Sequence, residues 1–500
     1  MSFIRKNIKE IFLTLTLIVF AYVMIRCHYM RLSWNVFWMD TAYSVGMIRR
    51  PFWDMVKAST DDVHPPLYYY FGKVLKHFLG DTPTAYRGTA FIPYLGILAL
   101  AVTLIRKYFG FGTSLLVIAF ASFTPSSIVY VMEARMYELG LFLALCSFLA
   151  FRNLIFNDKS KPVIRWTVFY ITTILTAYTH YYLTVSICIL YLCVIVYSIF
   201  RKKETGYCII CSALAILSYL PRLGVLISNL SDTSGNWWTS GYSHTDENLR
   251  EIFGYRGFYI TALILISVAL ISRIIMLRAK KAEDKQGEEN IRQITLILTG
   301  LLMIFLTMGV GTLVSIIIRP YLISRFLYPL SAIGWILMGI GISETADLIV
   351  KVFSLKDEKR SGYIAGGISI AVCVFFSGMV ISLSYNDYLG NINYQLMSTL
   401  ETNEFLIRTQ IPAGAVIYSD IGDERTIIDC YYPGRDVHIE HGLFYYGEPE
   451  ADEFYMVWSN SNAEAAAENL VSYGYEVVPL DDNGVLGIQR DVSVLFCRKY

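Results

Sequence analysis

The sequence predicts a mainly α-helical protein that crosses a membrane many times and carries a small α/β domain at its C-terminal end. Three observations support this fold class. Of the 500 residues, 55% are hydrophobic and only 17% are charged, and the mean hydropathy is +0.47. A soluble chain needs about a quarter charged residues to cover its surface. Apolar runs of membrane-spanning length recur along the chain, and the charges divide into a basic and an acidic part. This composition excludes a cytosolic enzyme, a secreted repeat protein and a disordered scaffold.

About eleven apolar runs approach the roughly 18–20 residues that a helix needs to cross a bilayer. They lie at 11–28, 88–105, 112–130, 137–155, 163–179, 181–200, 207–227, 257–277, 294–317, 324–343 and 362–383. The first run follows Arg5, Lys6 and Lys9 like a signal peptide, but no small-residue cleavage site comes after it. We therefore expect a retained helix.

Lys and Arg gather in alternate connections between these runs. The basic connections are 106–107, 152–165, 201–203, 278–292 and 351–360. Because positive loops stay in the cytoplasm, this pattern predicts a multi-pass plasma-membrane protein with a cytoplasmic N-terminus. Three segments are then long and extracytoplasmic: 29–87, 228–256 and 384–500.

Two domains are expected. Residues 1–383 carry 36 Lys and Arg against 22 Asp and Glu, whereas residues 384–500 carry 6 against 19. The first is the transmembrane domain, with 29–87 as its first outer, catalytic loop. The second is an acidic outer domain whose apolar stretches at 415–418, 454–458, 476–479 and 492–497, with a helical stretch at 463–473, predict an α/β fold. Cys430 and Cys497 fall in this tail and could pair. No basic face or nucleic-acid motif is present, so we expect no nucleic-acid partner.

The first outer loop places a carboxylate among aromatic residues. Asp40 follows Trp34, Phe37, Trp38 and Met39. Aromatic rings stack on sugar C–H faces, and a carboxylate can take a hydroxyl proton, so this cluster fits a sugar site. The alternative is an interfacial aromatic belt with a solvated aspartate.

A second motif in this loop is Asp61-Asp62-Val63-His64-Pro65-Pro66. The two prolines favour an extended segment, in which Asp62 and His64 point to the same side. They could bind a divalent metal ion or a phosphate; a hydrated turn is the alternative, and two ligands alone are a weak metal signal. The sequence establishes no cofactor, and a divalent metal at Asp62 and His64 stays open.

Further ionisable residues lie at the predicted outer ends of helices. Glu133, Arg135 and Tyr137 open the fourth run, where Arg135 needs an anion: a carboxylate or a lipid phosphate. Arg325 repeats this pattern before another run, with snorkelling to the interface as the alternative. His180 and Tyr181 lie where two runs meet on the outer side, and a lone histidine there is more often structural. A reaction centre is therefore expected at the outer membrane–water interface.

These segments together resemble the glycosyltransferase family 39 group of GT-C fold enzymes, which includes protein O-mannosyltransferases and lipid A aminoarabinose transferases. The matching stretches cover roughly residues 1–383. They read MDTAYSVG, DVHPPLYYYFGKVLKHFLGD, YRGTAFIPYLG, VMEARMYELGLFLAL, AYTHYYLT and SRFLYPL, in this order.

The resemblance implies transfer of a sugar from a polyprenyl-phosphate donor to an acceptor hydroxyl on the outer face. It implies that Asp40 is the catalytic carboxylate, in a place where the family often has Asp-Glu and this chain has Asp40-Thr41. Asp62 and His64 would approach the donor phosphate or a metal, and Arg135 and Arg325 would neutralise that phosphate. Trp38, Glu133, Tyr137, His180 and Tyr181 would bind substrate or support the site.

The expected mechanism is a single inverting displacement with Asp40 as general base. The expected partners are the donor lipid, the bilayer and an acceptor that the sequence does not specify: a glycan, a lipid or a protein. The rival classes are a lipid or polysaccharide transporter, an envelope polysaccharide polymerase, and a receptor whose tail carries the function.

Overall fold

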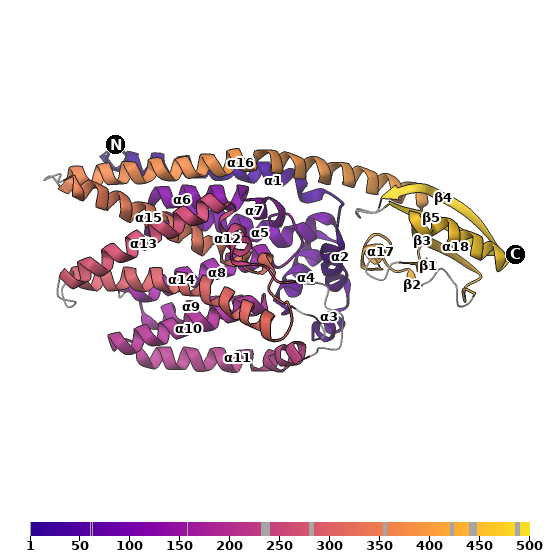
Figure 1. The fold of residues 1–500 in the computed structure, drawn as a ribbon, viewed down its shortest axis with the longest axis horizontal. Helices are drawn as coiled ribbons and strands as arrows, with labels where there is room; N and C mark the ends of the chain where they lie inside the picture. Colours follow the sequence, from indigo (N-terminus) through magenta and orange to yellow (C-terminus); the bar gives the residue numbers. More distant parts are fainter. Residues whose placement is uncertain are drawn as a thin grey trace.

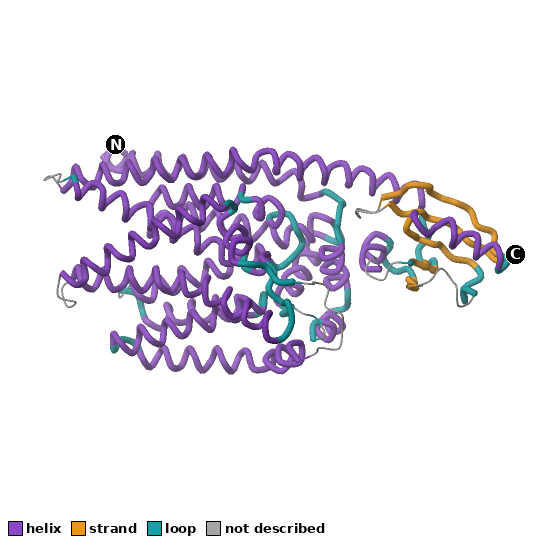
Figure 2. The backbone as a smooth tube through the Cα atoms, viewed as in Figure 1, coloured by secondary structure: helices purple, strands orange, loops and turns teal. Residues whose placement is uncertain are grey.

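The computed structural model describes residues 2–500 except Asp61, Val63, Asp158 and the segments 232–240, 280–284, 354–357, 421–424, 440–447 and 486–490. It consists of a bundle of long helices with a small sheet domain at one end (Figures 1 and 2). The helices that form the bundle are α1 (Ser2–Tyr29), α5 (Pro83–Leu100), α6 (Arg106–Phe123), α8 (Tyr137–Phe156), α9 (Pro162–Ala177), α10 (Tyr181–Arg201), α11 (Thr205–Ser231), α13 (Arg256–Ala279), α14 (Lys285–Ile317), α15 (Ser331–Val352) and α16 (Glu358–Thr409).

The protein is a multi-pass membrane protein. The described residues contain nine helical stretches that are long and apolar enough to cross a membrane. Each of the eleven predicted runs lies on helix. Two of them share the stretch Pro83–Phe123, whose backbone turns sharply at Gly110 (φ 90°), and the run 163–179 coincides with the shorter apolar helix α9. The positive φ explains why a glycine stands at this turn, since other residues rarely adopt it.

Five short helices lie between the long ones: α2 (Met39–Arg49), α3 (Phe52–Ala58), α4 (Leu67–Leu79), α7 (Pro125–Tyr130) and α12 (Thr245–Phe253). Of these, α2, α3 and α4 lie at the end of the bundle that faces the sheet domain (Figure 1). The first three belong to the predicted first outer loop, and α12 belongs to the second. Two 3₁₀ turns, Ser324–Phe326 and Tyr328–Leu330, precede α15 at the same end.

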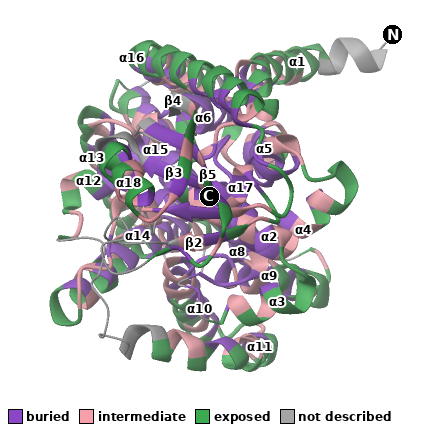
Figure 3. Ribbon diagram, turned by 90° about the vertical axis from the view of Figure 1, so that its right-hand side faces the viewer, coloured by how far each residue is buried: buried purple, intermediate pink, exposed green. Residues whose placement is uncertain are grey.

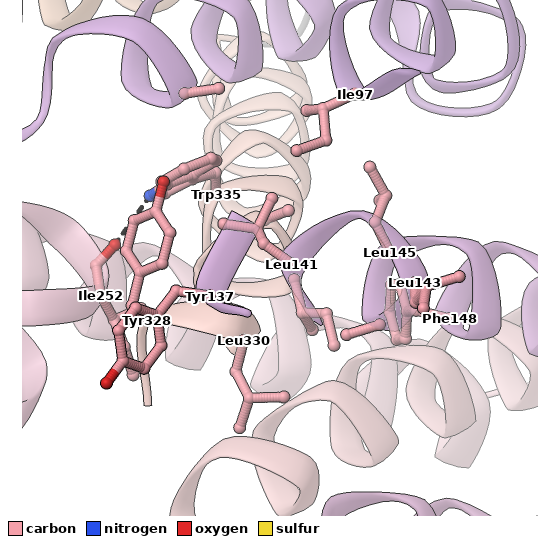
Figure 4. Packing of buried hydrophobic residues seen from close by; sticks show 14 of the residues in the cluster. Ile97, Tyr137, Leu141, Leu143, Leu145, Phe148, Ile252, Tyr328, Leu330 and Trp335 are labelled. Atoms are coloured by element: carbon pink, nitrogen blue, oxygen red, sulfur yellow. Dashed lines mark hydrogen bonds between the residues drawn. The ribbon is translucent and has the colours of Figure 1, made fainter. Parts of the chain in front are cut away.

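The innermost helices are α8 and α15. Most residues of both are buried, whereas α1 and α16 are largely exposed along one rim (Figure 3). Close packing around α15 is visible where the Trp335 indole donates a hydrogen bond to the carbonyl of Ile252 at 2.8 Å, beside the rings of Tyr137 and Tyr328 (Figure 4). This bond fastens α12 to the core of the bundle.

The C-terminal domain is a five-stranded sheet in the order β2-β1-β3-β5-β4. The strands are β1 (Val416–Ser419), β2 (Asp436–Ile439), β3 (Glu453–Ser459), β4 (Tyr475–Val485) and β5 (Asp491–Lys499), with α17 (Arg425–Tyr431) and α18 (Asn460–Ser472) between them. β1 pairs in parallel with β2 and β3, and β5 runs antiparallel to β3 and β4.

Alternating side chains give this sheet two packed faces. One face places Phe454, Met456 and Trp458 against α18. The other face packs Val457 and its neighbours against the end of α16 and against α17. The α/β fold predicted for the tail is therefore confirmed, and the four predicted strands and the predicted helix are all present.

Two expectations about the tail differ from the structure. Helix α16 does not end at the predicted boundary after residue 383 but continues to Thr409, because hydropathy marks where a helix leaves the membrane rather than where it stops. Cys430 and Cys497 are free thiols. Cys430 packs against the helix bundle, whereas Cys497 lies in the core between the sheet and α18. The pairing that the sequence left open is therefore not formed, because the two thiols lie in separate cores.

Candidate functional site

The candidate site gathers around Asp40 in the first turn of α2. Arg325, in the turn before α15, places Nη1 3.0 Å from Asp40 Oδ2. Arg135, in the turn before α8, places Nη2 4.0 Å from the same oxygen. Three segments that are far apart in the sequence therefore bring two guanidiniums to one carboxylate.

Arg135 also fixes the helix that carries Asp40. Its Nη1 donates to the Asp40 carbonyl and to Ser44 Oγ, each at 3.2 Å. Arg135 is only 3% exposed. Burial opposes its charge, but the neighbouring Tyr137 and Asp40 outweigh that effect, and the pKa of Arg135 is raised. The guanidinium therefore stays charged.

Two buried polar atoms at this point accept or donate no hydrogen bond within the part of the chain that the structure describes. They are Arg135 Nε and Tyr137 Oη. Buried polar groups in native proteins nearly always find a partner. Two such atoms beside the Asp40 ion pairs indicate a place for a polar ligand.

Glu133 and Trp38 lie beside this cluster. The Trp38 indole donates to Glu133 Oε1 at 3.1 Å, and the Arg325 guanidinium lies 5.9 Å from the centre of the Trp38 ring. Burial raises the pKa of Glu133 to about 7, with the negative charge of Asp40 adding to it and the two arginines opposing it. Glu133 is thus a carboxyl group that titrates near neutral pH.

Asp62 and His64 lie together, as predicted from the extended segment. His64 Nδ1 is 3.5 Å from Asp62 Oδ1, and the Tyr69 hydroxyl donates to Asp62 Oδ2 at 2.6 Å. Burial opposes the charge of Asp62, but His64 and Tyr69 outweigh it, and the pKa of Asp62 is lowered. Burial lowers the pKa of His64. The pair therefore consists of an aspartate and a neutral histidine.

The residues at this pair do not form a metal site by themselves. Within the described ranges, no group of three or more His, Cys, Asp or Glu side chains is arranged to hold a metal ion. Protein zinc sites use three or four protein ligands. Asp62 and His64 alone are thus fewer ligands than a zinc site requires.

His180 and Tyr181 differ in their surroundings. His180 Nδ1 accepts the Tyr182 amide at 3.2 Å and so caps α10. Its ring lies 5.5 Å from the His64 ring and 6.3 Å from the Tyr137 ring. Burial, assisted by His64 and the two arginines, holds the pKa of His180 well below its ordinary value. Tyr181 instead contacts Arg222, with the guanidinium 5.7 Å from its ring.

Other residues support the site without having been predicted. Arg87 donates to the carbonyls of Trp34, Val36 and Met132, so it joins the aromatic part of the first loop to the turn that holds Glu133. Glu251, on α12, is hydrogen-bonded to Ser324 beside Arg325, and burial raises its pKa. The sequence could have pointed to Arg222, because it is a charged residue inside an apolar run of membrane-spanning length.

The C-terminal domain contacts this region through α17. Tyr431 Oη accepts the Phe37 amide at 2.8 Å, and Arg49, at the end of α2, donates to the Cys430 carbonyl at 2.7 Å. Arg49 also pairs with Asp81 at 2.8 Å. Helix α2, which carries Asp40, is thereby held at both ends.

Comparison with solved structures identifies similar folds. ArnT from Cupriavidus metallidurans in the apo state is 12% identical, with 96% of this chain and 97% of that chain covered and a TM-score of 0.59. ArnT from the same organism bound to undecaprenyl phosphate is 12% identical, with 98% of each chain covered and a TM-score of 0.55.

An oligosaccharyltransferase from Archaeoglobus fulgidus in complex with Zn and sulfate is 10% identical over 90% of this chain and 69% of that chain, with a TM-score of 0.46. No protein-family model and no curated protein sequence matches this chain. At these identities the similarity to ArnT establishes the fold alone.

Proposed function

Because the chain has the GT-C fold of polytopic membrane glycosyltransferases, we propose that it transfers a sugar from a polyprenyl-phosphate donor to an acceptor hydroxyl. The reaction takes place at the end of the bundle that carries α2 and the sheet domain. The donor's isoprenoid chain lies in the bilayer and its head group lies at Asp40. The acceptor is the hydroxyl of a glycan, a lipid or a protein.

One observation carries this proposal: Arg135 and Arg325 converge on Asp40, beside buried polar atoms that have no protein partner among the described residues. Two guanidiniums at one point suit a phosphate, whose oxygens accept their paired N–H groups. A carboxylate at the same point suits a general base. The ArnT structure with undecaprenyl phosphate supports a lipid of this class as the ligand of the fold.

The proposed reaction begins with the arrival of the donor phosphate. The phosphate replaces Asp40 as the partner of the Arg325 and Arg135 guanidiniums. Asp40 is then released from its ion pair and can accept a proton.

The chemical step is a single displacement. The acceptor oxygen attacks the anomeric carbon while its proton moves to Asp40, and the bond from that carbon to the phosphate oxygen breaks on the opposite side, which inverts the configuration. Arg135 and Arg325 stabilise the charge that develops on the departing phosphate. Phosphate leaves readily, so no general acid is needed.

The proposal includes an orientation. The basic connections between helices predict that the N-terminus lies in the cytoplasm and that α2 and the C-terminal domain lie outside. The donor would then be used from the outer leaflet.

Release of polyprenyl phosphate tests the function directly. Purified protein in detergent, incubated with short-chain polyprenyl-phosphate sugars and a mixture of hydroxyl acceptors, should release polyprenyl phosphate, and Asp40→Asn should not. Mass spectrometry of lipid that co-purifies with the protein should identify the donor. Release that is equal in the two proteins, or a co-purifying lipid without an isoprenoid phosphate, would contradict the proposal.

A further inference from the structure

Arg222 is a buried cation on a helix that is otherwise largely exposed. Helix α11 presents large apolar side chains to its surroundings, and only a small share of its apolar stretch is buried within the protein. Arg222 itself is 5% exposed and follows Pro221 within the helix. A buried guanidinium at this position is costly unless a specific partner compensates its charge.

The partners of Arg222 are backbone carbonyls of the first loop. Nη1 donates to the Ser59 carbonyl at 2.7 Å and Nη2 donates to the His64 carbonyl at 2.9 Å, with the Asp62 carbonyl at 3.5 Å from Nη2. All three of these contacts are to backbone carbonyls and not to side chains. The planar fork of an arginine can hold two such carbonyls at once.

These contacts fix a segment that has little regular structure of its own. Helix α3 ends at Ala58 and α4 begins at Leu67, and Ser59, Asp62 and His64 lie between these two helices. The amide of Leu67 donates to the Tyr178 carbonyl at 3.2 Å at the far end of this segment. Helix α3 lies beside the end of α11 that is nearer the sheet domain, in both views of the ribbon (Figures 1 and 3).

The carbonyls and the side chains of this segment have different partners. While the carbonyls of Asp62 and His64 face Arg222, the Asp62 carboxylate accepts the Tyr69 hydroxyl and the His64 ring lies by His180. Binding of the carbonyls by Arg222 therefore determines where the two side chains point. A shift of this backbone would move both side chains away from the cluster at Arg135.

We propose that Arg222 is a positioning residue for the donor site: it holds the backbone carbonyls of Ser59, Asp62 and His64 so that the Asp62 and His64 side chains face the donor head group, without touching the substrate itself. This inference rests on the proposed glycosyl transfer and extends it to a residue of α11. Nothing in the geometry requires Arg222 to contact the reacting atoms.

Two variants test this role by kinetics. Arg222→Gln should raise the apparent KM for the donor and lower kcat/KM by roughly 10- to 100-fold, the range expected for lost hydrogen bonds from a charged group. The kcat/KM of Arg222→Lys should lie between those of the original protein and of Arg222→Gln, because one ammonium cannot hold two carbonyls with the same geometry. Arg165→Gln is the control, since Arg165 on α9 is also buried and donates to two backbone carbonyls, those of Leu154 on α8 and of Asn157 after it, while also pairing with Glu204. Equal losses in Arg222→Gln and Arg165→Gln would show a merely structural role.

A double-mutant cycle gives a sharper test. If Arg222 acts through His64, then Arg222→Gln should cost much less in an His64→Ala background than in the original protein, because the group being positioned is already gone. Additive effects of the two substitutions would overturn the proposal.

Hydrogen exchange tests the same idea without any activity. Amides of the segment 59–67 should exchange faster in Arg222→Gln than in the original protein, and should be unchanged in Arg165→Gln. If the original protein releases no polyprenyl phosphate, the proposed function fails while this exchange experiment still decides whether Arg222 holds the loop. Unchanged exchange in Arg222→Gln would refute the positioning role even in an active enzyme.

Discussion

Arg325 Nη1 and Asp40 Oδ2 lie 3.0 Å apart, although one residue stands before α15 and the other opens α2. The carboxylate and the phosphate-binding cation of the proposed reaction are therefore paired with each other when no donor is bound. This pairing keeps a partly buried charge compensated in the free protein. It also means that donor and carboxylate compete for the same guanidinium.

The first prediction concerns Asp40. Asp40→Asn should lower turnover by about 10²–10⁴-fold, the usual contribution of a general base, while donor binding is kept or strengthened because the competing charge is gone. Turnover and binding of a labelled donor would be measured separately. Asp54→Asn is the matched control, since Asp54 is an exposed carboxylate in the same loop and should have little effect. Near-normal turnover of Asp40→Asn would exclude Asp40 as the base.

The second prediction concerns Arg325. Arg325→Gln should raise the donor concentration needed for half-maximal rate by roughly 10- to 100-fold, because a charge-assisted contact to phosphate is lost. Arg325→Lys should recover only part of this, since a lysine lacks the planar fork. Arg319→Gln serves as the control, because the Arg319 side chain packs on Tyr321 instead of on Asp40. An unchanged donor requirement in Arg325→Gln would remove this residue from the phosphate site.

The third prediction concerns the order of binding. Because Asp40 and Arg325 are paired until the donor phosphate arrives, the donor should bind first and the acceptor second. Initial rates would be measured at varied concentrations of both substrates, with a non-reactive donor analogue as inhibitor. The analogue should compete with the donor but not with the acceptor. Productive binding of acceptor to the donor-free protein would contradict this order.

The fourth prediction concerns pH. Burial raises the pKa of Glu133 to about 7, so this group gains negative charge as the pH passes through neutrality. The added charge lies beside the arginines that are proposed to bind phosphate, so the apparent KM for the donor should rise above about pH 7. Glu133→Gln should remove this rise. A profile that is the same in both proteins would show that another group titrates.

Glu133 should also affect stability in a defined direction. Its ordinary pKa is 4.5 and its folded value is about 7, so between these values the folded protein keeps a proton that the unfolded chain has released. Stability should therefore fall as the pH rises through this window, and the fall should be smaller in Glu133→Gln. Thermal midpoints at several pH values would measure it.

The membrane part of the fold could be predicted from the sequence because each crossing helix needs a long apolar run. The strands β1, β3, β4 and β5 were also recognisable as apolar stretches. By contrast, β2 and α17 are short, and their sequences, Asp436–Ile439 and Arg425–Tyr431, mix polar and apolar residues without a clear period. Their structure depends on packing against β1 and α2, which no local pattern records.

The candidate site likewise contains residues that the sequence identifies and residues that it does not. Asp40, Arg135 and Arg325 carry charges where a charge is costly, so the sequence points to them, and the structure brings them together. Arg87 and Arg222 act by donating to backbone carbonyls, and a carbonyl is present at every residue. Such contacts depend on the path of the chain and leave no sequence signature at the accepting positions.

Helix α16 runs without a break from the bundle to the sheet domain, over 52 residues. At about 1.5 Å per residue it is ~78 Å long, more than twice the thickness of the hydrocarbon core. The sheet domain is thus joined to the bundle by a rigid helix and not by a flexible linker. Its distance from the membrane and its orientation therefore depend on the number of residues in α16. One residue inserted in the exposed part of this helix would turn the whole tail by about 100° and pull α17 off α2. Because α17 contacts α2, a change in bilayer thickness that tilts the membrane-spanning part of α16 should also shift α2, which carries the proposed catalytic carboxylate Asp40.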